Sequence, residues 1–482
     1  MNQYLINELD AALMTQLNQI LEDRVAQKNC PSVFATLFQG HNILMQTGIG
    51  ERKIGAGIPG PETVYRIASC SKSFTVVMLL ILRDRGLVNL DSPITDFVPE
   101  FTQTAIGHAY DPPTIRMLMS MSGGLPTDDP WADRQESITN ETLRAIVSDG
   151  VLLTTAPGTQ FQYSNLGYAL LGQVIENVSG RPFRDLVKEE ILLPLNLHET
   201  GYEEEIVNAE QLAYGYRKSP DGWLELKFSR PGAFSCIGGL FSSGRNLAEW
   251  VRWLLSALSD EPDRTGPLSV ASRREMQQIV TAIPHGAGVA TLPRHADRFF
   301  GYGLGLISER DTKYGQFVSH TGGYPGFSSH MRWHAPTGLG VVVLENATYS
   351  GAAQTATELI DQVLQGVAFQ LPVIDVWTMT RVKAREANSL IQQWDDELAS
   401  QIFEENVILD IPLDERKAQI ERLIGELGGL TDSPSMQIQE DKSDSPLHMI
   451  WTIPAAHGAL TCEIRLSPKT PSLIQTFKVS RN

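Results

Sequence analysis

Two residues near the start of the chain are spaced as a nucleophile and its base would be. Ser69 and Lys72 stand in the stretch RIASCSKSFTVVMLL (66–80), where a polar cluster separates a strand-like run from an apolar helical run. Positions three apart share one face of a helix, so the lysine ammonium can lie beside the serine hydroxyl. A serine hydroxyl needs a nearby base to become a good nucleophile, and a helix N-terminus offers N–H groups to a developing oxyanion. The pattern Ser-x-x-Lys alone arises by chance about once in a chain of this length, and ordinary helix capping also explains it.

A second polar group precedes a clear helical run. Tyr163, Ser164 and Asn165 form Tyr-x-Asn in QFQYSNLGYALLG. A tyrosine near a lysine can be held as phenolate and act as a general base. An amide such as that of Asn165 can hydrogen-bond a substrate carbonyl and a lysine ammonium.

A third group ends an apolar strand-like run. His320, Thr321 and Gly322 stand in VSHTGGYPG. Glycine at such a position lets the backbone of a ligand lie close to the strand edge. Any one of the three groups alone could be a coincidence.

Other motifs argue against different chemistries. The stretch GAGIPG (55–60) fits Gly-x-Gly-x-x-Gly, but Pro59 and Pro61 stand where a nucleotide-binding helix would start, so we interpret it as a loop. No Gly-x-Ser-x-Gly elbow occurs, and no His-Glu-x-x-His or paired Cys-x-x-Cys predicts a metal site. The acidic stretch DDPWADRQ, which begins with Asp128 and Asp129, fits a solvated loop and a substrate-binding loop equally well.

In combination and in this order, the three groups resemble the serine β-lactamase and penicillin-binding-protein superfamily. The resemblance is closest to the class C β-lactamase-like branch, which includes DD-peptidases, D-aminopeptidases, esterases and some acyltransferases. It covers roughly residues 33–369 and includes the flanking text YRIASCSKSFT, PGTQFQYSNLGYALLG and GYGLGL.

The resemblance implies roles for particular residues. Ser69 would be the acylated nucleophile, and Lys72 and Tyr163 would shuttle its proton. The backbone N–H groups of Ser69 and Gly323 would form the oxyanion hole, and no metal or organic cofactor is expected. The substrate-binding residues that the resemblance implies are Asn165, His320, Thr321, Gly322 and Gly323.

One residue departs from the pattern of the true lactamases. These usually carry lysine where this chain has His320, whereas histidine is familiar among the peptidase and esterase relatives. We therefore expect hydrolysis of an amide or ester through an acyl-Ser69 intermediate, and not antibiotic resistance. Because the unperturbed pKa of histidine is about 6.5, a pH–rate limb from His320 is expected, unless the imidazole only makes a hydrogen bond at the strand end.

Two other functions fit the same residues. An acyltransferase would use the same acyl-enzyme but pass the acyl group to a bound alcohol or amine. A scaffold or binding protein would keep the fold without turnover, although intact Ser69, Lys72, Tyr163 and Asn165 argue against this alternative.

Composition narrows the partners. The 482 residues carry a formal charge of −17, from 39 basic and 56 acidic side chains, which argues against a nucleic-acid or anionic-membrane partner. We expect a small-molecule or short peptide substrate, and the oligomeric state stays open. The N-terminal 27 residues read as an amphipathic surface helix without the apolar core of a signal peptide, so the cytoplasm is the default location. The scattered cysteines, expected as free thiols, are Cys30, Cys70, Cys236 and Cys462.

The order of predicted elements indicates an α/β fold. Strands occur early and late with helices between them, which predicts an antiparallel sheet flanked by helices plus a helical lobe over residues 1–370. Residues 371–482 are predicted to form a small α+β accessory domain. The main predicted elements are a hairpin around 40–42, a strand at 63–69, helices at 69–86, 166–180, 246–258 and 352–369, strands at 302–308, 315–323, 328–336 and 339–346, and C-terminal helices at 376–403 and 414–430 followed by three or four strands.

Overall fold

The chain forms two compact units. In the computed structural model these are Met1–Leu371 and Pro372–Asn482, which divide next to the boundary expected from the change in sequence character. Each unit has its own hydrophobic core. The described residues are 5–104, 109–284, 298–371, 373–431 and 435–481.

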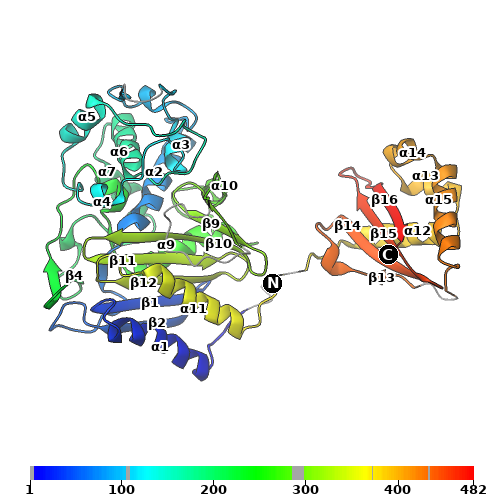
Figure 1. The fold of residues 1–482 in the computed structure, drawn as a ribbon, viewed down its shortest axis with the longest axis horizontal. Helices are drawn as coiled ribbons and strands as arrows, with labels where there is room; N and C mark the ends of the chain where they lie inside the picture. The colour runs from blue at the N-terminus through cyan, green and yellow to red at the C-terminus, as the bar shows by residue number, and fades with distance from the viewer. Residues whose placement is uncertain (1–4, 105–108, 285–297, 372, 432–434, 482) are drawn as a thin grey trace. The chain divides into compact units, whose positions relative to one another are not determined.

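The first unit is built on an eight-stranded antiparallel sheet with the order β2-β1-β12-β11-β10-β9-β8-β7. The predicted hairpin forms β1 and β2, which turn at Gly40, a residue with a φ of 53°. Because β1 also pairs with β12, the early and late strands lie side by side (Figure 1), which confirms a sheet built from both ends of the domain. The strands are β1 (Ser32–Gln39), β2 (Asn42–Gly50), β7 (Thr281–Ala282), β8 (Arg298–Tyr302), β9 (Ile307–Asp311), β10 (Gly315–Tyr324), β11 (Phe327–His334) and β12 (Leu339–Glu345).

Both faces of the sheet are covered. Along β1, Val33 and Leu37 pack in the core with α1 and α11, whereas Phe34 and Phe38 belong to the core that includes the helical lobe. This alternation follows from the two-residue period of a strand. Figure 1 shows α1 and α11 together on one face. The covering helices are α1 (Ala11–Ala26), α9 (Gly244–Ser256) and α11 (Ala352–Gly366).

The predicted helix after Ser69 begins differently from the expectation. Residues Ala68–Ser71 form a 3₁₀ turn (η1), and the α-helix α2 runs from Lys72 to Asp84. Trp250 of α9 holds this helix, because its ring stacks on Phe74 with centroids 3.8 Å apart and its Nε1 donates to Ser73 Oγ at 3.0 Å.

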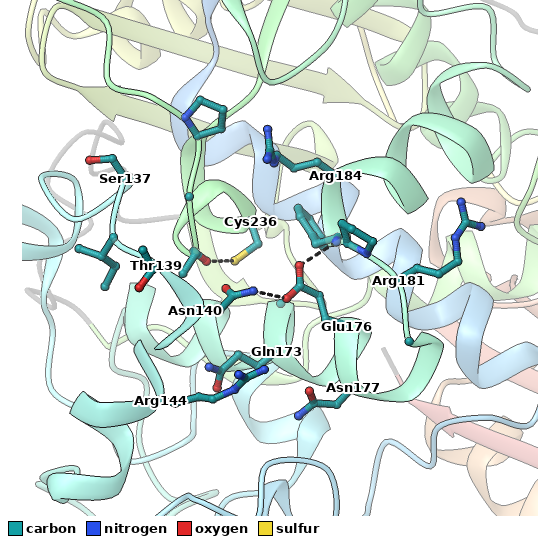
Figure 2. Close-up of a pocket in the computed structure, with 18 residues that line it drawn as sticks. Ser137, Thr139, Asn140, Arg144, Gln173, Glu176, Asn177, Arg181, Arg184 and Cys236 are labelled. Atoms are coloured by element: carbon teal, nitrogen blue, oxygen red, sulfur yellow. Dashed lines mark hydrogen bonds between the residues drawn. The ribbon is translucent and has the colours of Figure 1, made fainter. Parts of the chain in front are cut away.

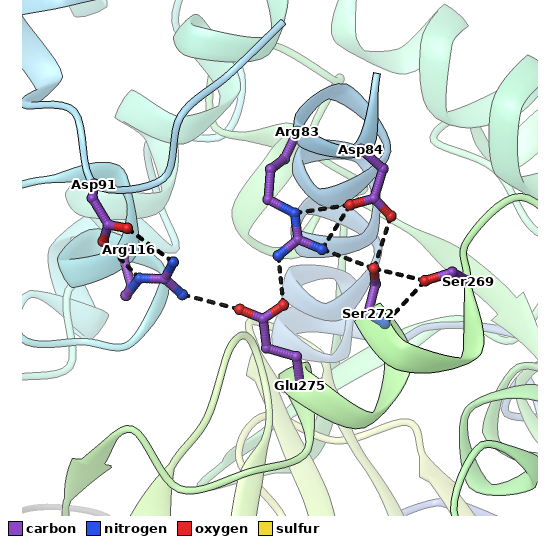
Figure 3. A network of polar contacts seen from close by, with 7 residues as sticks. All are labelled: Arg83, Asp84, Asp91, Arg116, Ser269, Ser272 and Glu275. Carbon is purple, nitrogen blue, oxygen red and sulfur yellow. Dashed lines mark hydrogen bonds and ion pairs between the residues drawn. The ribbon is translucent and has the colours of Figure 1, made fainter. Parts of the chain in front are cut away.

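A polar network fixes the other end of α2 (Figure 3). Glu275 of α10 (Val270–Met276) accepts from Arg83 of α2 and from Arg116 of α3 (Ile115–Met119). Partly exposed ion pairs contribute little individually, but this carboxylate joins three segments of the chain. The helix that carries Lys72 is therefore anchored at both ends.

The helical lobe contains α5 (Asn140–Asp149), α6 (Asn165–Ser179), α7 (Phe183–Val187) and α8 (Ser235–Gly238). Helix α6 agrees with its prediction: Ser164 Oγ caps the backbone N–H of Gly167, and Gly180 ends the helix at a φ of 67°.

Three predicted elements are wrong in extent. The expected strand at 63–69 is the short strand β3 (Val64–Arg66), because the η1 turn begins at Ala68. The expected strand at 302–308 is two strands, because Gly305 with a φ of 73° forms a turn between β8 and β9. The expected helix at 376–403 breaks into α12 (Thr378–Gln392) and α13 (Asp396–Ile402). Asp395 causes the restart, since its side chain caps the backbone N–H groups of Glu397 and Leu398.

The second unit is the predicted small α+β domain. A four-stranded antiparallel sheet with the order β13-β14-β15-β16 packs against helices around Trp451, which is fully buried. Its elements are α12, α13, α14 (Glu405–Asp410), α15 (Leu413–Glu426), β13 (Gln437–Ile438), β14 (His448–Ala455), β15 (Gly458–Leu466) and β16 (Ile474–Arg481).

The structure bears on two sequence expectations, the state of the cysteines and the absence of a membrane-spanning helix. All four cysteines are buried free thiols. Free thiols are typical of a reducing compartment, and the cytoplasm stays a prediction. Among the described helices, none combines the length and apolar character needed to cross a membrane.

Candidate active site

Ser69 and Lys72 are in contact. Lys72 Nζ lies 2.8 Å from Ser69 Oγ, and the second partner of Nζ is the backbone carbonyl oxygen of Ile237 in α8, at 2.9 Å. Ala68 precedes the serine with a φ of 48°, a left-handed conformation that is strained for a residue with a side chain. The turn therefore presents the hydroxyl of Ser69, which is 7% exposed, to the lysine amine.

Burial favours the neutral form of Lys72. The side chain is fully buried, and desolvation lowers its pKa below the ordinary value of 10.5. The carboxylates of Asp129, Asp133 and Asp128 oppose this shift without cancelling it. A neutral amine that donates one hydrogen to the Ile237 carbonyl can still accept the serine proton on its lone pair.

Tyr163 lies beside the same pair of residues. Lys72 Nζ lies 5.0 Å from the centre of its ring, and its hydroxyl lies near enough to the Ser69 side chain for that side chain to lower its pKa slightly. Burial and then the charge of Asp129 raise the pKa of the phenol well above 10. The phenolate that sequence reasoning allowed is therefore disfavoured, and burial favours a neutral phenol, which can donate a proton.

The side chain of Asn165 hydrogen-bonds to Asp129, and not to Lys72 as the sequence suggested. Its Nδ2 donates to Asp129 Oδ1 at 2.6 Å, and its backbone N–H donates to Asp128 Oδ1 at 2.7 Å. Its Oδ1 is buried and has no hydrogen-bond partner among the described residues. The side chain thus offers an acceptor for a substrate N–H, and the acidic loop holds the amide in place.

His320 is enclosed within the protein. The side chain is 1% exposed; its Nε2 lies 2.9 Å from the Tyr302 hydroxyl and its Nδ1 lies 2.8 Å from the Thr321 carbonyl oxygen. Burial is the main reason that the pKa of the imidazole is lowered to about 3, and Lys72 lowers it further when the lysine is protonated. The expectation that His320 changes charge near neutral pH is wrong for this reason, and the alternative of a hydrogen bond at the strand agrees with the contacts.

A pH profile tests this arrangement. Because the imidazole stays neutral, we predict that His320→Gln leaves the shape of the kcat/KM profile unchanged between about pH 5 and pH 8. The measurement is kcat/KM against pH for both proteins. A limb near pH 6.5 in the wild type that disappears in the variant would contradict the buried, neutral assignment.

The part of β10 that follows His320 lies against the η1 turn that carries Ser69. A Cβ atom on Gly322 would stand 2.3 Å from the Ile67 carbonyl oxygen, and one on Gly323 would stand 2.4 Å from the ring of Tyr349. Both glycines are therefore required by packing. Thr321 Oγ1 is held at 2.9 Å by His330 Nδ1.

Sequence reasoning missed several residues of this site. Asp133 is 4% exposed, and burial raises the pKa of its carboxyl to about 7 although the Tyr349 hydroxyl donates to it at 2.6 Å. Asp133 stands in the acidic stretch that begins at Asp128, so that stretch was a usable signal. The carbonyl of Ile237 and the hydroxyls of Tyr302 and Tyr349 gave no signal, because any residue can supply the first and tyrosines are common.

Comparison with known proteins decides the family. The Beta-lactamase family model matches residues 17–365. The chain belongs to the β-lactamase family. This membership confirms the resemblance to the serine β-lactamases and penicillin-binding proteins, and it indicates a serine hydrolase.

Individual relatives are distant. Protein flp of Staphylococcus aureus strain COL is 24% identical over 343 residues, and the match covers 69% of this chain and 62% of the length of flp. The octameric penicillin-binding protein homologue from Pyrococcus abyssi is 19% identical with a TM-score of 0.63, and the match covers 97% of this chain and 99% of that one. A D-stereospecific amidohydrolase from Streptomyces is 25% identical with a TM-score of 0.57, and the match covers 73% and 98%. The Pyrococcus match shows that the fold of both units recurs.

Proposed function

We propose that the protein hydrolyses an amide or ester bond of a small molecule or short peptide through a covalent acyl-Ser69 intermediate. The observation that carries this proposal is the contact of 2.8 Å between Ser69 Oγ and Lys72 Nζ, together with the lowered pKa of that lysine. Family membership supports the reaction class.

In the acylation step, neutral Lys72 accepts the Ser69 hydroxyl proton while Oγ attacks the substrate carbonyl carbon. The carbonyl oxygen becomes an oxyanion, which the backbone N–H groups of Ser69 and Gly323 stabilise. The bond to the leaving group then breaks, and the Tyr163 hydroxyl gives that group its proton. The Lys72 ammonium then returns a proton to the Tyr163 phenolate, so both side chains are neutral again.

In the deacylation step, water attacks the acyl-Ser69 carbonyl and Lys72 accepts its proton. The ester bond to Oγ breaks, and Oγ recovers a proton from the lysine ammonium. The product is a carboxylic acid, and the starting state of all three side chains is restored.

The charges of the site favour a substrate with a free amine. Asp129 and Asp133 lie close enough to Lys72 to affect its pKa, and Asn165 Oδ1 is an acceptor that no described residue uses. A protonated amine can pair with the carboxylates and donate to the amide oxygen. The name of the Streptomyces D-stereospecific amidohydrolase agrees with amide substrates.

Two matched substrates test this preference. D-alanine p-nitroanilide, with its free amine, should have a kcat/KM at least about tenfold above that of N-acetyl-D-alanine p-nitroanilide, because a charge-assisted hydrogen bond is lost in the second. Asp133→Asn should reduce this ratio. Equal values for the two substrates would contradict amine recognition, whereas failure to hydrolyse either, or any ester, would contradict the proposed reaction.

The raised pKa of Asp133 also predicts a stability change. A carboxyl whose folded-state pKa is about 7 favours the folded state when protonated, so its contribution is lost as pH rises from its ordinary 3.8 through 7. Asp133→Asn cannot ionise, and should be more stable than the wild type above pH 7 by up to roughly 4 kcal/mol. Urea unfolding at about pH 5 and pH 8 measures the difference. A variant that is less stable at the higher pH would contradict a buried, raised carboxyl.

A further inference from the structure

A pocket of about 570 Å³ lies within the helical lobe (Figure 2). It is lined by α5, the C-terminal half of α6, the start of α7 and the segment 231–236. None of Ser69, Lys72 and Tyr163 lines it, so it is a separate cavity from the candidate active site. Its volume falls in the range typical of small-molecule sites.

Gln173 is the unusual residue of this pocket. Its side chain comes from α6, lines the cavity and is 4% exposed. Both Oε1 and Nε2 lack a hydrogen-bond partner among the described residues. Buried polar groups are nearly always hydrogen-bonded, so an amide with an unused acceptor and an unused donor marks a place where a ligand supplies both partners.

One positive charge of the pocket is also unused. Arg144 of α5 is exposed and makes no hydrogen bond or ion pair within the part of the chain that the structure describes. The other charged side chains of the lining already have partners. Their pairs are Arg181 with Glu189, Arg184 with Glu203, and Glu176 with the side-chain amide of Asn140 and the backbone N–H of Phe183.

We propose that this pocket is a second ligand site, for a small carboxylate that also carries a primary or cyclic amide. The guanidinium fork of Arg144 matches the two oxygens of one carboxylate. The carboxamide of Gln173 matches the N–H and C=O that lie side by side on a primary amide or a lactam. A single unused arginine fits one negative charge better than two.

The pocket is lined in part by α8, the short helix whose backbone accepts a hydrogen bond from Lys72. Cys236 of α8 lines the cavity, and its backbone carbonyl accepts from Thr75 Oγ1 of α2 at 2.7 Å. The next residue is Ile237, whose carbonyl accepts from Lys72 Nζ. A ligand in the pocket therefore contacts the same short helix that helps to place Lys72.

Pyroglutamate is the probe that tests the proposal, because it joins a lactam to a carboxylate. Two matched compounds each lack one group: 2-pyrrolidone has the lactam alone, and cyclopentanecarboxylate has the carboxylate alone. Isothermal titration of the full chain should show saturable binding of pyroglutamate, and each control should bind at least about tenfold more weakly. The absence of saturable binding by pyroglutamate would overturn the proposal.

Three variants place the binding in this pocket. Arg144→Gln and Gln173→Met should each weaken pyroglutamate binding by about tenfold or more, whereas Arg264→Gln, at an exposed arginine outside the pocket lining, should not. Gln173→Met should keep or raise the Tm, since it removes two unsatisfied polar groups. Binding that neither pocket variant weakens, or a lowered Tm in Gln173→Met, would overturn the proposal.

Discussion

Ser69→Ala is expected to abolish both turnover and covalent labelling by a fluorophosphonate or a β-lactam. The variant removes the only atom that the proposed mechanism acylates, so the loss of kcat should reach at least about 10,000-fold. Intact-mass measurement of the labelled protein and a p-nitrophenyl ester assay give the two readouts. The variant should fold normally, because Lys72 is the only hydrogen-bond partner of the Ser69 hydroxyl among the described residues.

Two neighbouring serines provide matched controls. Ser71 Oγ accepts from the backbone N–H of Leu240, and Ser73 Oγ bridges Trp250 and the Cys70 carbonyl. Both are buried in structural contacts, so Ser71→Ala and Ser73→Ala should keep the label even where they lower stability. A serine adduct that persists in Ser69→Ala would show that the nucleophile is misassigned.

The sheet was predictable because its strands carry a local signal. The runs that became β1 and β12 are apolar and rich in β-branched or aromatic residues, and glycine-containing turns separate β10 from β11 and β11 from β12. The expectation that the early and late strands belong to one sheet came only from the rule that the elements of a domain pack around one common core. The split at Gly305 was missed because alternating glycine and leucine resembles a strand in sequence. Only the structure shows the positive φ of Gly305 that makes the turn.

The protonation states of the site were not predictable in the same way. Residue type gives the ordinary pKa, but the shift depends on burial and on partners that are distant in sequence. Tyr302 lies 18 positions from His320, and Ile237 lies 165 positions from Lys72. The sequence therefore indicated that Ser69, Lys72 and Tyr163 lie together, whereas only the packing indicates that His320 is neutral and that the neutral form of Tyr163 is favoured.

Lys72 and Tyr163 are expected to act as one unit with Ser69. In the proposed cycle a single proton passes from serine to lysine to tyrosine, and loss of either carrier stops the same transfer. Lys72→Met and Tyr163→Phe should therefore each lower kcat/KM by about 1,000-fold or more, and the double variant should lose little beyond the larger single loss. A double-mutant cycle on one ester substrate measures the coupling.

Tyr168 supplies the matched control for this cycle. Its ring also lies near the lysine, 5.6 Å from Nζ, but its hydroxyl donates to the Met119 carbonyl oxygen. Tyr168→Phe should therefore have a small effect that adds to that of Lys72→Met, because proximity to the ammonium alone does not place a phenol on the proton path. The contrary outcome is a double variant whose fold loss in kcat/KM equals the product of the two single losses. In that case the two side chains do not share a proton, and Lys72 acts on Ser69 without the tyrosine.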